Sequence, residues 1–128
     1  LKDIGIKRHD PEMIVGKMSG GERQSIAIAR AVYFGAKLVI LDEPTSALSI
    51  KESEKVLQYV IDLKRRGISS IIISHNIYHV YSVADRIVVL DRGRKVLDIP
   101  KELASPEEII DVIAHRMPPE KLQSRAKT

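Results

Sequence analysis

The order of hydrophobic and polar residues predicts helices alternating with strands through the first half of the chain. Apolar side chains recur at helical spacing from residue 20 onward and Gly35 follows them, so we predict a helix over 20–34. Residues 38–41 then form a short apolar run that stops before Pro44, which is typical of a strand buried on both faces of a parallel sheet. Residues 68–74 have the same character and predict a second buried strand.

The segment between these strands predicts a second helix, from residue 50 to about residue 66. Ser49 precedes it and Glu52 follows three residues later, which is the pattern of a capping box, and Gly67 marks the end of the helix. Apolar residues at helical spacing predict a buried face made of Val56, Val60, Ile61 and Leu63.

Smaller elements are predicted in the next part of the chain. A short helix is expected over 76–83. Two segments that contain apolar residues, 86–90 and 94–99, flank an Asp-Arg-Gly turn, which predicts an antiparallel hairpin with Gly93 at positive φ.

The last part of the chain predicts one further helix and a tail. Pro106 is expected to begin a helix that continues to about residue 116, and the charged residues after Pro119 are expected to form a frayed tail. Strands and helices alternate in the preceding sequence, so the predicted architecture is an α/β layer with parallel central strands.

Composition narrows the class of protein. A chain of 128 residues with 44% hydrophobic content supports one core, so we expect a single unit. The absence of cysteine excludes disulfides and thiolate metal sites and fits a reducing compartment such as the cytoplasm. The net charge of +4 comes from 21 basic residues scattered among 17 acidic ones, and aromatic content is 4%. We therefore expect no nucleic-acid partner, because neither a basic stripe nor stacking platforms are present.

Polar residues follow both predicted strands, at the edge where ligands bind in open parallel sheets. Asp42 and Glu43 end the first strand, where one carboxylate could orient Mg²⁺ through water and its neighbour could position an attacking water. His75 ends the second strand and could donate a hydrogen bond to a phosphate. Taken singly, an acidic pair that merely ends a strand and a structural histidine are the simpler interpretations. The other histidines, His9, His79 and His115, lack this setting and metal-ligand spacing, and we expect them on the surface or in packing.

Two glycines stand where the first helix begins. Each costs a helix about 1 kcal/mol relative to alanine, so their presence needs a reason. Ser19 and Glu22 also fit a capping box, in which case Gly20 and Gly21 are merely tolerated. Alternatively, the missing Cβ atoms let backbone amides at the positive helix end approach a phosphate. Residues 18–24 by themselves leave both interpretations open.

Three features in sequence order resemble those of ATP-binding-cassette (ABC) ATPases. They are the serine-diglycine helix start, a strand ending in Asp-Glu-Pro and a later strand ending in histidine. Residues 18–24 are similar to the signature motif, 38–43 to the Walker B strand, 46–49 to the D-loop and His75 to the switch histidine. The segments 42–49 and 74–86 most resemble ATPases of bacterial monosaccharide importers, and Ser49 stands where the D-loop usually has aspartate.

The resemblance implies an α/β, P-loop NTPase-like parallel-sheet core, incomplete, with part of the helical signature subdomain and a C-terminal β-hairpin plus helices. One partial domain over 1–128 is implied, with a signature-helix part at 1–35, catalytic-core strands and helices at 36–99 and a helical tail at 100–128. ATP and Mg²⁺ are the implied cofactors, with Asp42 on the metal and with Glu43 and His75 as catalytic residues. The residues implied to face nucleotide are Ser19, Gly20, Gly21, Glu22 and Ser49.

The pattern G-x-x-x-x-G-K-[ST] of a Walker A loop does not occur in these residues. The resemblance implies that this loop precedes Leu1, so we expect the chain to be the C-terminal portion of a nucleotide-binding subunit, inactive in ATP hydrolysis by itself. In the family the Walker A strand lies beside the strand ending in His75. We therefore expect an unpaired apolar edge at 71–73 and self-association of the fragment.

The implied partners are a second ABC ATPase subunit, packed head to tail, and transmembrane permease subunits. The implied location is the cytoplasmic face of the cell membrane, as a peripheral subunit of a simple-sugar importer. Two alternatives remain: a soluble ABC-type ATPase acting in DNA maintenance or translation, and a non-catalytic binding or regulatory module.

Overall fold

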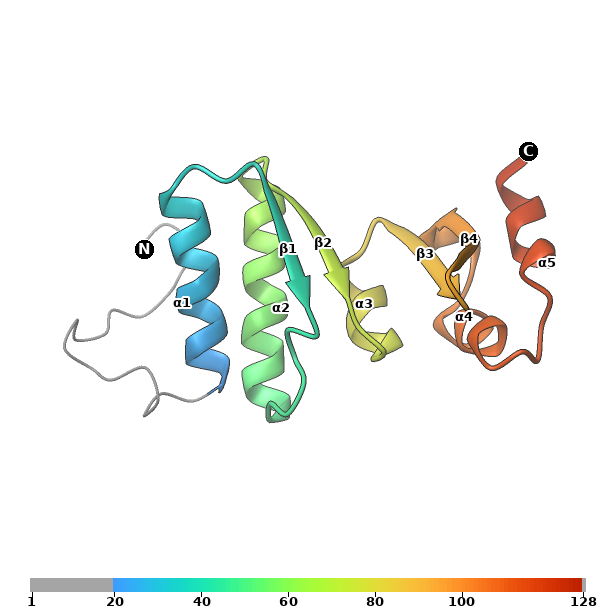
Figure 1. Cartoon of the computed structure of the whole chain (residues 1–128), viewed down its shortest axis with the longest axis horizontal. Helices are drawn as coiled ribbons and strands as arrows, with labels where there is room; N and C mark the ends of the chain where they lie inside the picture. Colours follow the sequence, from blue (N-terminus) through green and yellow to red (C-terminus); the bar gives the residue numbers. More distant parts are fainter. Residues whose placement is uncertain (1–19, 128) are drawn as a thin grey trace. The chain divides into compact units, whose positions relative to one another are not determined.

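The computed structural model describes residues 20–127, which belong to two compact units, one ending at His75 and the other beginning at Asn76. Both units appear in Figure 1. The assignment of residues 1–128 to one partial domain with parts at 1–35, 36–99 and 100–128 stays a prediction.

The first unit alternates helices and strands as the hydrophobic pattern predicts. Its elements are α1 (Gly20–Tyr33), β1 (Leu38–Asp42), α2 (Ile50–Arg65) and β2 (Ser69–Ile73). The two strands pair in parallel, with register from Leu38 opposite Ser69 to Asp42 opposite Ile73. Helices α1 and α2 run side by side next to this sheet (Figure 1).

The buried stripe of each helix follows the helical period. In α1, Gly21, Ser25, Ile28 and Ala29 are buried, and this helix packs against α2. In α2, the predicted Val56, Val60 and Leu63 are buried together with Ser53 and Tyr59. Ile61 is only half-buried, contrary to prediction, because it lies about 160° around the helix from the buried Tyr59 and so falls outside the buried stripe.

The prediction that both strands are buried on both faces is wrong. In β1, Val39 and Leu41 are buried, whereas Ile40 between them is 61% exposed. In β2, Ile71 and Ile73 are about half exposed. A strand with a continuous apolar run is buried on both faces only if other elements pack on both faces of its sheet. In the described part of this unit, elements pack on one face.

The second unit is a hairpin with short helices packed on one face. Its elements are α3 (Ile77–Val83), β3 (Arg86–Asp91), β4 (Arg94–Pro100), the 3₁₀ turn η3 (Lys101–Leu103), α4 (Pro106–Ile113), α5 (Pro119–Gln123) and the 3₁₀ turn η4 (Ser124–Lys127). Strands β3 and β4 are antiparallel. The turn residues Arg92 and Gly93 have φ of 52° and 78°, the two positive values of a type I′ turn, so the Gly93 prediction is confirmed.

The core of the second unit joins residues of both strands, of the turn after β4 and of helices α4 and α5. It consists of Ile87, Val89, Leu97, Ile99, Ala104, Ile109, Val112 and Leu122.

Helix α4 is shorter than predicted. It ends at Ile113 with Ala114 as its C-cap, not near residue 116. His115 adopts the left-handed conformation at φ 59°, which stops the helix in the way a glycine commonly does.

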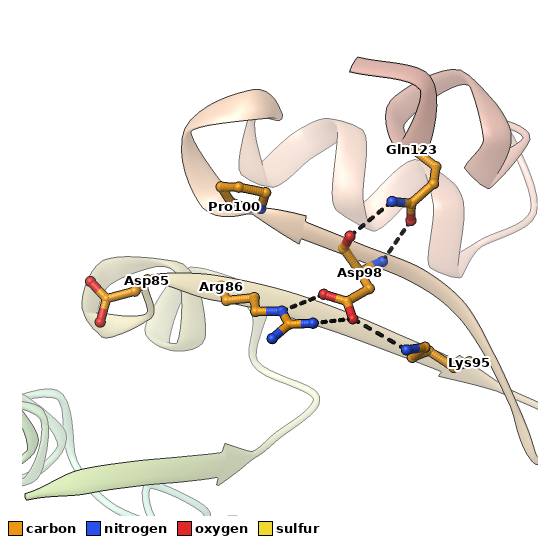
Figure 2. Close-up of a pocket in the computed structure, with 6 residues that line it drawn as sticks. All are labelled: Asp85, Arg86, Lys95, Asp98, Pro100 and Gln123. Carbon is orange, nitrogen blue, oxygen red and sulfur yellow. Dashed lines mark hydrogen bonds and ion pairs between the residues drawn. The ribbon is translucent and has the colours of Figure 1, made fainter. Parts of the chain in front are cut away.

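The prediction of a frayed tail is also wrong. Leu122 is fully buried, and the Gln123 amide binds both backbone groups of Asp98 at 2.8 and 2.9 Å (Figure 2). Figure 2 also shows that Arg86 and Lys95 donate hydrogen bonds to the Asp98 carboxylate. These three residues line a hollow between β3, β4 and α5, and their charges are paired with one another. One apolar anchor and a few directed hydrogen bonds thus order a segment whose composition is charged.

A bidentate ion pair ties the end of the tail to α4. Arg125 donates to both oxygens of Glu108 at 3.0 and 2.8 Å. These hydrogen bonds, followed by that of the Ser105 amide, lower the pKa of Glu108 from its ordinary 4.5 to about 2. A carboxyl whose pKa is lowered on folding stabilises the protein above pH 4.5, and this contribution disappears as pH falls toward 2.

We therefore expect the melting-temperature difference between wild type and Arg125→Gln to be largest near neutral pH and to shrink between pH 4.5 and 2. Thermal melts at half-unit pH steps measure it. A difference that is constant across this range would contradict the assignment.

Candidate functional site

The parallel pairing of β1 and β2 brings two predicted site residues into contact. Asp42 is in register with Ile73, and the Glu43 amide extends the ladder by donating to the Ile73 carbonyl at 2.7 Å. Beyond the ladder, Glu43 Oε1 lies 2.9 Å from His75 Nδ1 and accepts the His75 backbone amide at 3.2 Å. An acid and an imidazole 32 positions apart therefore meet at the carboxyl ends of the strands.

The backbone at Glu43 is in an unusual conformation. Its φ is 50°, in the left-handed region that residues with side chains seldom adopt and that costs on the order of 1 kcal/mol or more. The buried Pro44 follows immediately, so the chain turns sharply after β1. Such local strain is more common at functional sites than elsewhere.

The pair is accessible to ligands. The His75 side chain is 84% exposed and the Glu43 side chain 37%. Mainly through the side-chain hydrogen bond, His75 lowers the pKa of Glu43, so Glu43 is a carboxylate at neutral pH. An ionised carboxylate can accept hydrogen bonds from a water molecule and orient it, although a lowered pKa makes it a weaker base.

Asp42 is exposed at the end of β1, directly before this pair. Within residues 20–127, no three acidic, histidine or cysteine side chains gather to hold a metal by themselves. A single carboxylate nevertheless fits Mg²⁺, which proteins usually bind through one or two carboxylates together with waters and substrate phosphates.

The glycines at the start of α1 lie against the segment that begins α2. A Cβ on Gly20 would lie 2.7 Å from Leu48 Cδ2, and one on Gly21 would lie 2.9 Å from Glu52 Oε2. Close packing therefore gives a structural reason for both glycines that the sequence did not reveal. Glu22 is half-buried on the same turn of α1, and Ser19 lies outside the described residues.

Ser49 caps α2, as the sequence predicts. Its hydroxyl oxygen accepts the Glu52 backbone amide at 3.1 Å and donates to Glu52 Oε1 at 3.1 Å. The second carboxylate oxygen of Glu52 accepts the Gly21 amide at 3.2 Å. Sequence reasoning assigned Glu52 to the cap alone and missed this contact, because nothing in the local pattern connects residues 31 positions apart.

The structure thus groups the described candidates in two places. Glu43 and His75 are in contact, with Asp42 next in the chain, and Gly21 is linked to Ser49 through Glu52. His115, expected on the surface, is about half exposed and lies 2.9 Å from Asp91.

Known proteins are similar to this chain in sequence and in fold. The family described as ABC transporter matches residues 1–46. A xylose/arabinose import ATP-binding protein of Sulfolobus acidocaldarius is 49% identical over 113 residues, which are 88% of this chain and 45% of that protein. The chain belongs to the ABC transporter ATP-binding family. A fructose import ATP-binding protein of Rhizobium meliloti is 44% identical over 121 residues, covering 93% of this ABC chain and 46% of that relative.

Solved structures agree with this assignment. A dimeric ATP-binding cassette in a post-hydrolysis state, bound to ADP and Pi, matches 78% of this ABC chain at a TM-score of 0.65 and 27% identity, over 43% of its own length. A nucleotide-free cassette from an ABC transporter matches 77% at a TM-score of 0.65 and 26% identity, over 38% of its length. The α/β, P-loop NTPase-like fold class is therefore confirmed. The chain spans less than half the length of the two import proteins. No helix in the described residues is long and apolar enough to cross a membrane.

Proposed function

We propose that this chain is part of the ATP-hydrolysing subunit of an ABC importer for a simple sugar. The observation that carries the proposal is the contact between Glu43 and His75 beyond the ends of two parallel strands. It occurs in a chain that is 49% identical over 113 residues to a protein named for xylose and arabinose import.

The first group of residues suits the chemistry of phosphoryl transfer to water. The ionised Glu43 orients the attacking water, and the exposed His75 donates a hydrogen bond to a phosphate oxygen. Asp42 holds Mg²⁺ through water, and the ion supplies charge neutralisation on the phosphates when it is bound.

The second group of residues contacts a different nucleotide, one bound mainly by the other subunit of a dimer. In the proposed head-to-tail dimer, Ser19, Gly20, Gly21, Glu22 and Ser49 face a nucleotide held mainly by the second ABC ATPase subunit. Helix α1 has 14 residues, so its amino end has the full positive character of a helix terminus.

The proposed partners also include permease subunits, on which the protein sits at the cytoplasmic face of the membrane. The exposed Ile71 and Ile73 on β2 support the further proposal that the isolated chain self-associates along this strand.

Reconstitution tests the function. The full-length gene product is placed in proteoliposomes with its permease, and ATP hydrolysis is measured with xylose, arabinose or fructose and the matching binding protein. We expect hydrolysis that a sugar stimulates and that is coupled to its uptake. Hydrolysis stimulated by DNA or ribosomes, and by no sugar, would instead support a soluble ABC-type ATPase.

A further inference from the structure

The Glu52 carboxylate contacts two of the residues proposed to face nucleotide, Gly21 and Ser49. Glu52 Oε1 accepts the Ser49 hydroxyl at 3.1 Å, and Glu52 Oε2 accepts the Gly21 backbone amide at 3.2 Å. Glu52 lies in the first turn of α2, whereas Gly21 lies in the first turn of α1. The side chain therefore connects the amino ends of two helices that pack against each other.

The position of this carboxylate depends on the glycine that it contacts. Any side chain at Gly21 would place a Cβ 2.9 Å from Glu52 Oε2 and 3.1 Å from Glu52 Cβ. Gly21 is buried, and its amide donates to a carboxylate oxygen in a partly buried contact. The amino end of a helix favours such a negative charge.

We propose that the Glu52 carboxylate accepts the Gly21 amide proton when no ligand is bound, and that an incoming phosphate group must displace this carboxylate. This inference rests on the proposed function, in which the start of α1 faces a nucleotide phosphate. The Gly21 amide has a single proton, and two anionic oxygens that approach it repel each other. Phosphate and the Glu52 carboxylate consequently compete for it.

The Ser49 contact gives the displaced side chain a defined second position. Ser49 binds Glu52 Oε1, the oxygen that does not contact Gly21, and also accepts the Glu52 backbone amide. Glu52 can therefore leave Gly21 and remain hydrogen-bonded to the cap of α2. Binding of phosphate at the start of α1 therefore changes the contacts of Glu52 with Ser49, the residue at the D-loop aspartate position.

The contact itself is tested first, without ligand. In amide NMR spectra of the ¹⁵N-labelled chain, Glu52→Ala is expected to move the Gly21 amide proton upfield, because the hydrogen bond to the carboxylate is lost. Glu54→Ala, at an exposed position two residues further along α2, is the matched control and is expected to leave the Gly21 signal in place. Equal shifts in both variants would overturn the proposal.

The competition is tested with inorganic phosphate as the probe. Glu52→Gln keeps the size of the side chain and a hydrogen-bond acceptor but removes the charge, and Glu54→Gln removes the same charge elsewhere. We expect the phosphate concentration that half-saturates the Gly21 shift to be about three- to tenfold lower in Glu52→Gln than in wild type and to change less than twofold in Glu54→Gln.

Equal phosphate affinity in Glu52→Gln and wild type would overturn the proposal, as would the absence of any phosphate response at Gly21 in all three proteins. Neither result bears on sugar-stimulated ATP hydrolysis by the reconstituted full-length protein, so failure of this inference is distinguishable from failure of the proposed function.

Discussion

Replacing Glu43 by glutamine in the full-length protein is expected to lower the rate of ATP hydrolysis by about 100-fold or more while nucleotide still binds. The glutamine has the same size and can still accept the His75 backbone amide, which the carboxylate accepts at 3.2 Å. What the substitution removes is the negative charge that the His75 contact helps maintain at neutral pH. A neutral amide orients water less strongly and cannot take its proton.

The control is Glu54→Gln, which removes the same charge at an exposed position on α2 and is expected to leave the hydrolysis rate within twofold. Steady-state hydrolysis gives the rate, and binding of a fluorescent nucleotide analogue gives the affinity. If Glu43→Gln retained more than a third of the wild-type rate, Glu43 would not act on the water, and the contact with His75 would be structural.

Most helices and strands could be predicted from the sequence because their ends have local signals. Helix α2 begins after Ser49, whose hydroxyl accepts the Glu52 amide, and stops before Gly67, which has φ of 78°. Pro106 likewise begins α4. Signals of this kind act over three or four residues, so they can be read without knowing the rest of the fold.

Burial and the chain tail were harder to predict because both depend on distant residues. Ile40 is exposed although it stands in an apolar run, since its burial requires a covering layer that the run itself does not specify. The charged composition after Pro119 indicated fraying, but Leu122 fills a core built from β3, β4 and α4. Composition averages over a segment, whereas a single buried side chain can order it.

The candidate site was predicted in part. The ends of two predicted parallel strands placed Glu43 and His75 at one edge of the sheet, and their side chains lie 2.9 Å apart. The left-handed backbone of Glu43 has no local signal, because glycine or asparagine is the usual residue there. The reach of Glu52 to Gly21 depends on how α1 packs on α2, which a short motif does not contain.

The second large effect is expected from Leu122→Ala, which should lower the free energy of unfolding by about 2–5 kcal/mol. Leu122 is fully buried in the core of the second unit, although it lies six residues from the end of the chain. Truncation to alanine removes the apolar contacts and leaves a cavity. The loss falls at the low end of this range if α5 detaches locally, because local unfolding then limits the effect.

Leu90→Ala is the matched control, since it makes the same change on β3 at a side chain that is 72% exposed, and we expect an effect within about 0.5 kcal/mol. Urea denaturation followed by circular dichroism measures both values. Hydrogen exchange shows which part of the second unit unfolds first, because amides of α5 should lose protection in Leu122→Ala before those of β3 and β4 do. Equal and small effects in the two variants would mean that the tail frays, as its charged composition suggests, and that Leu122 does not anchor it.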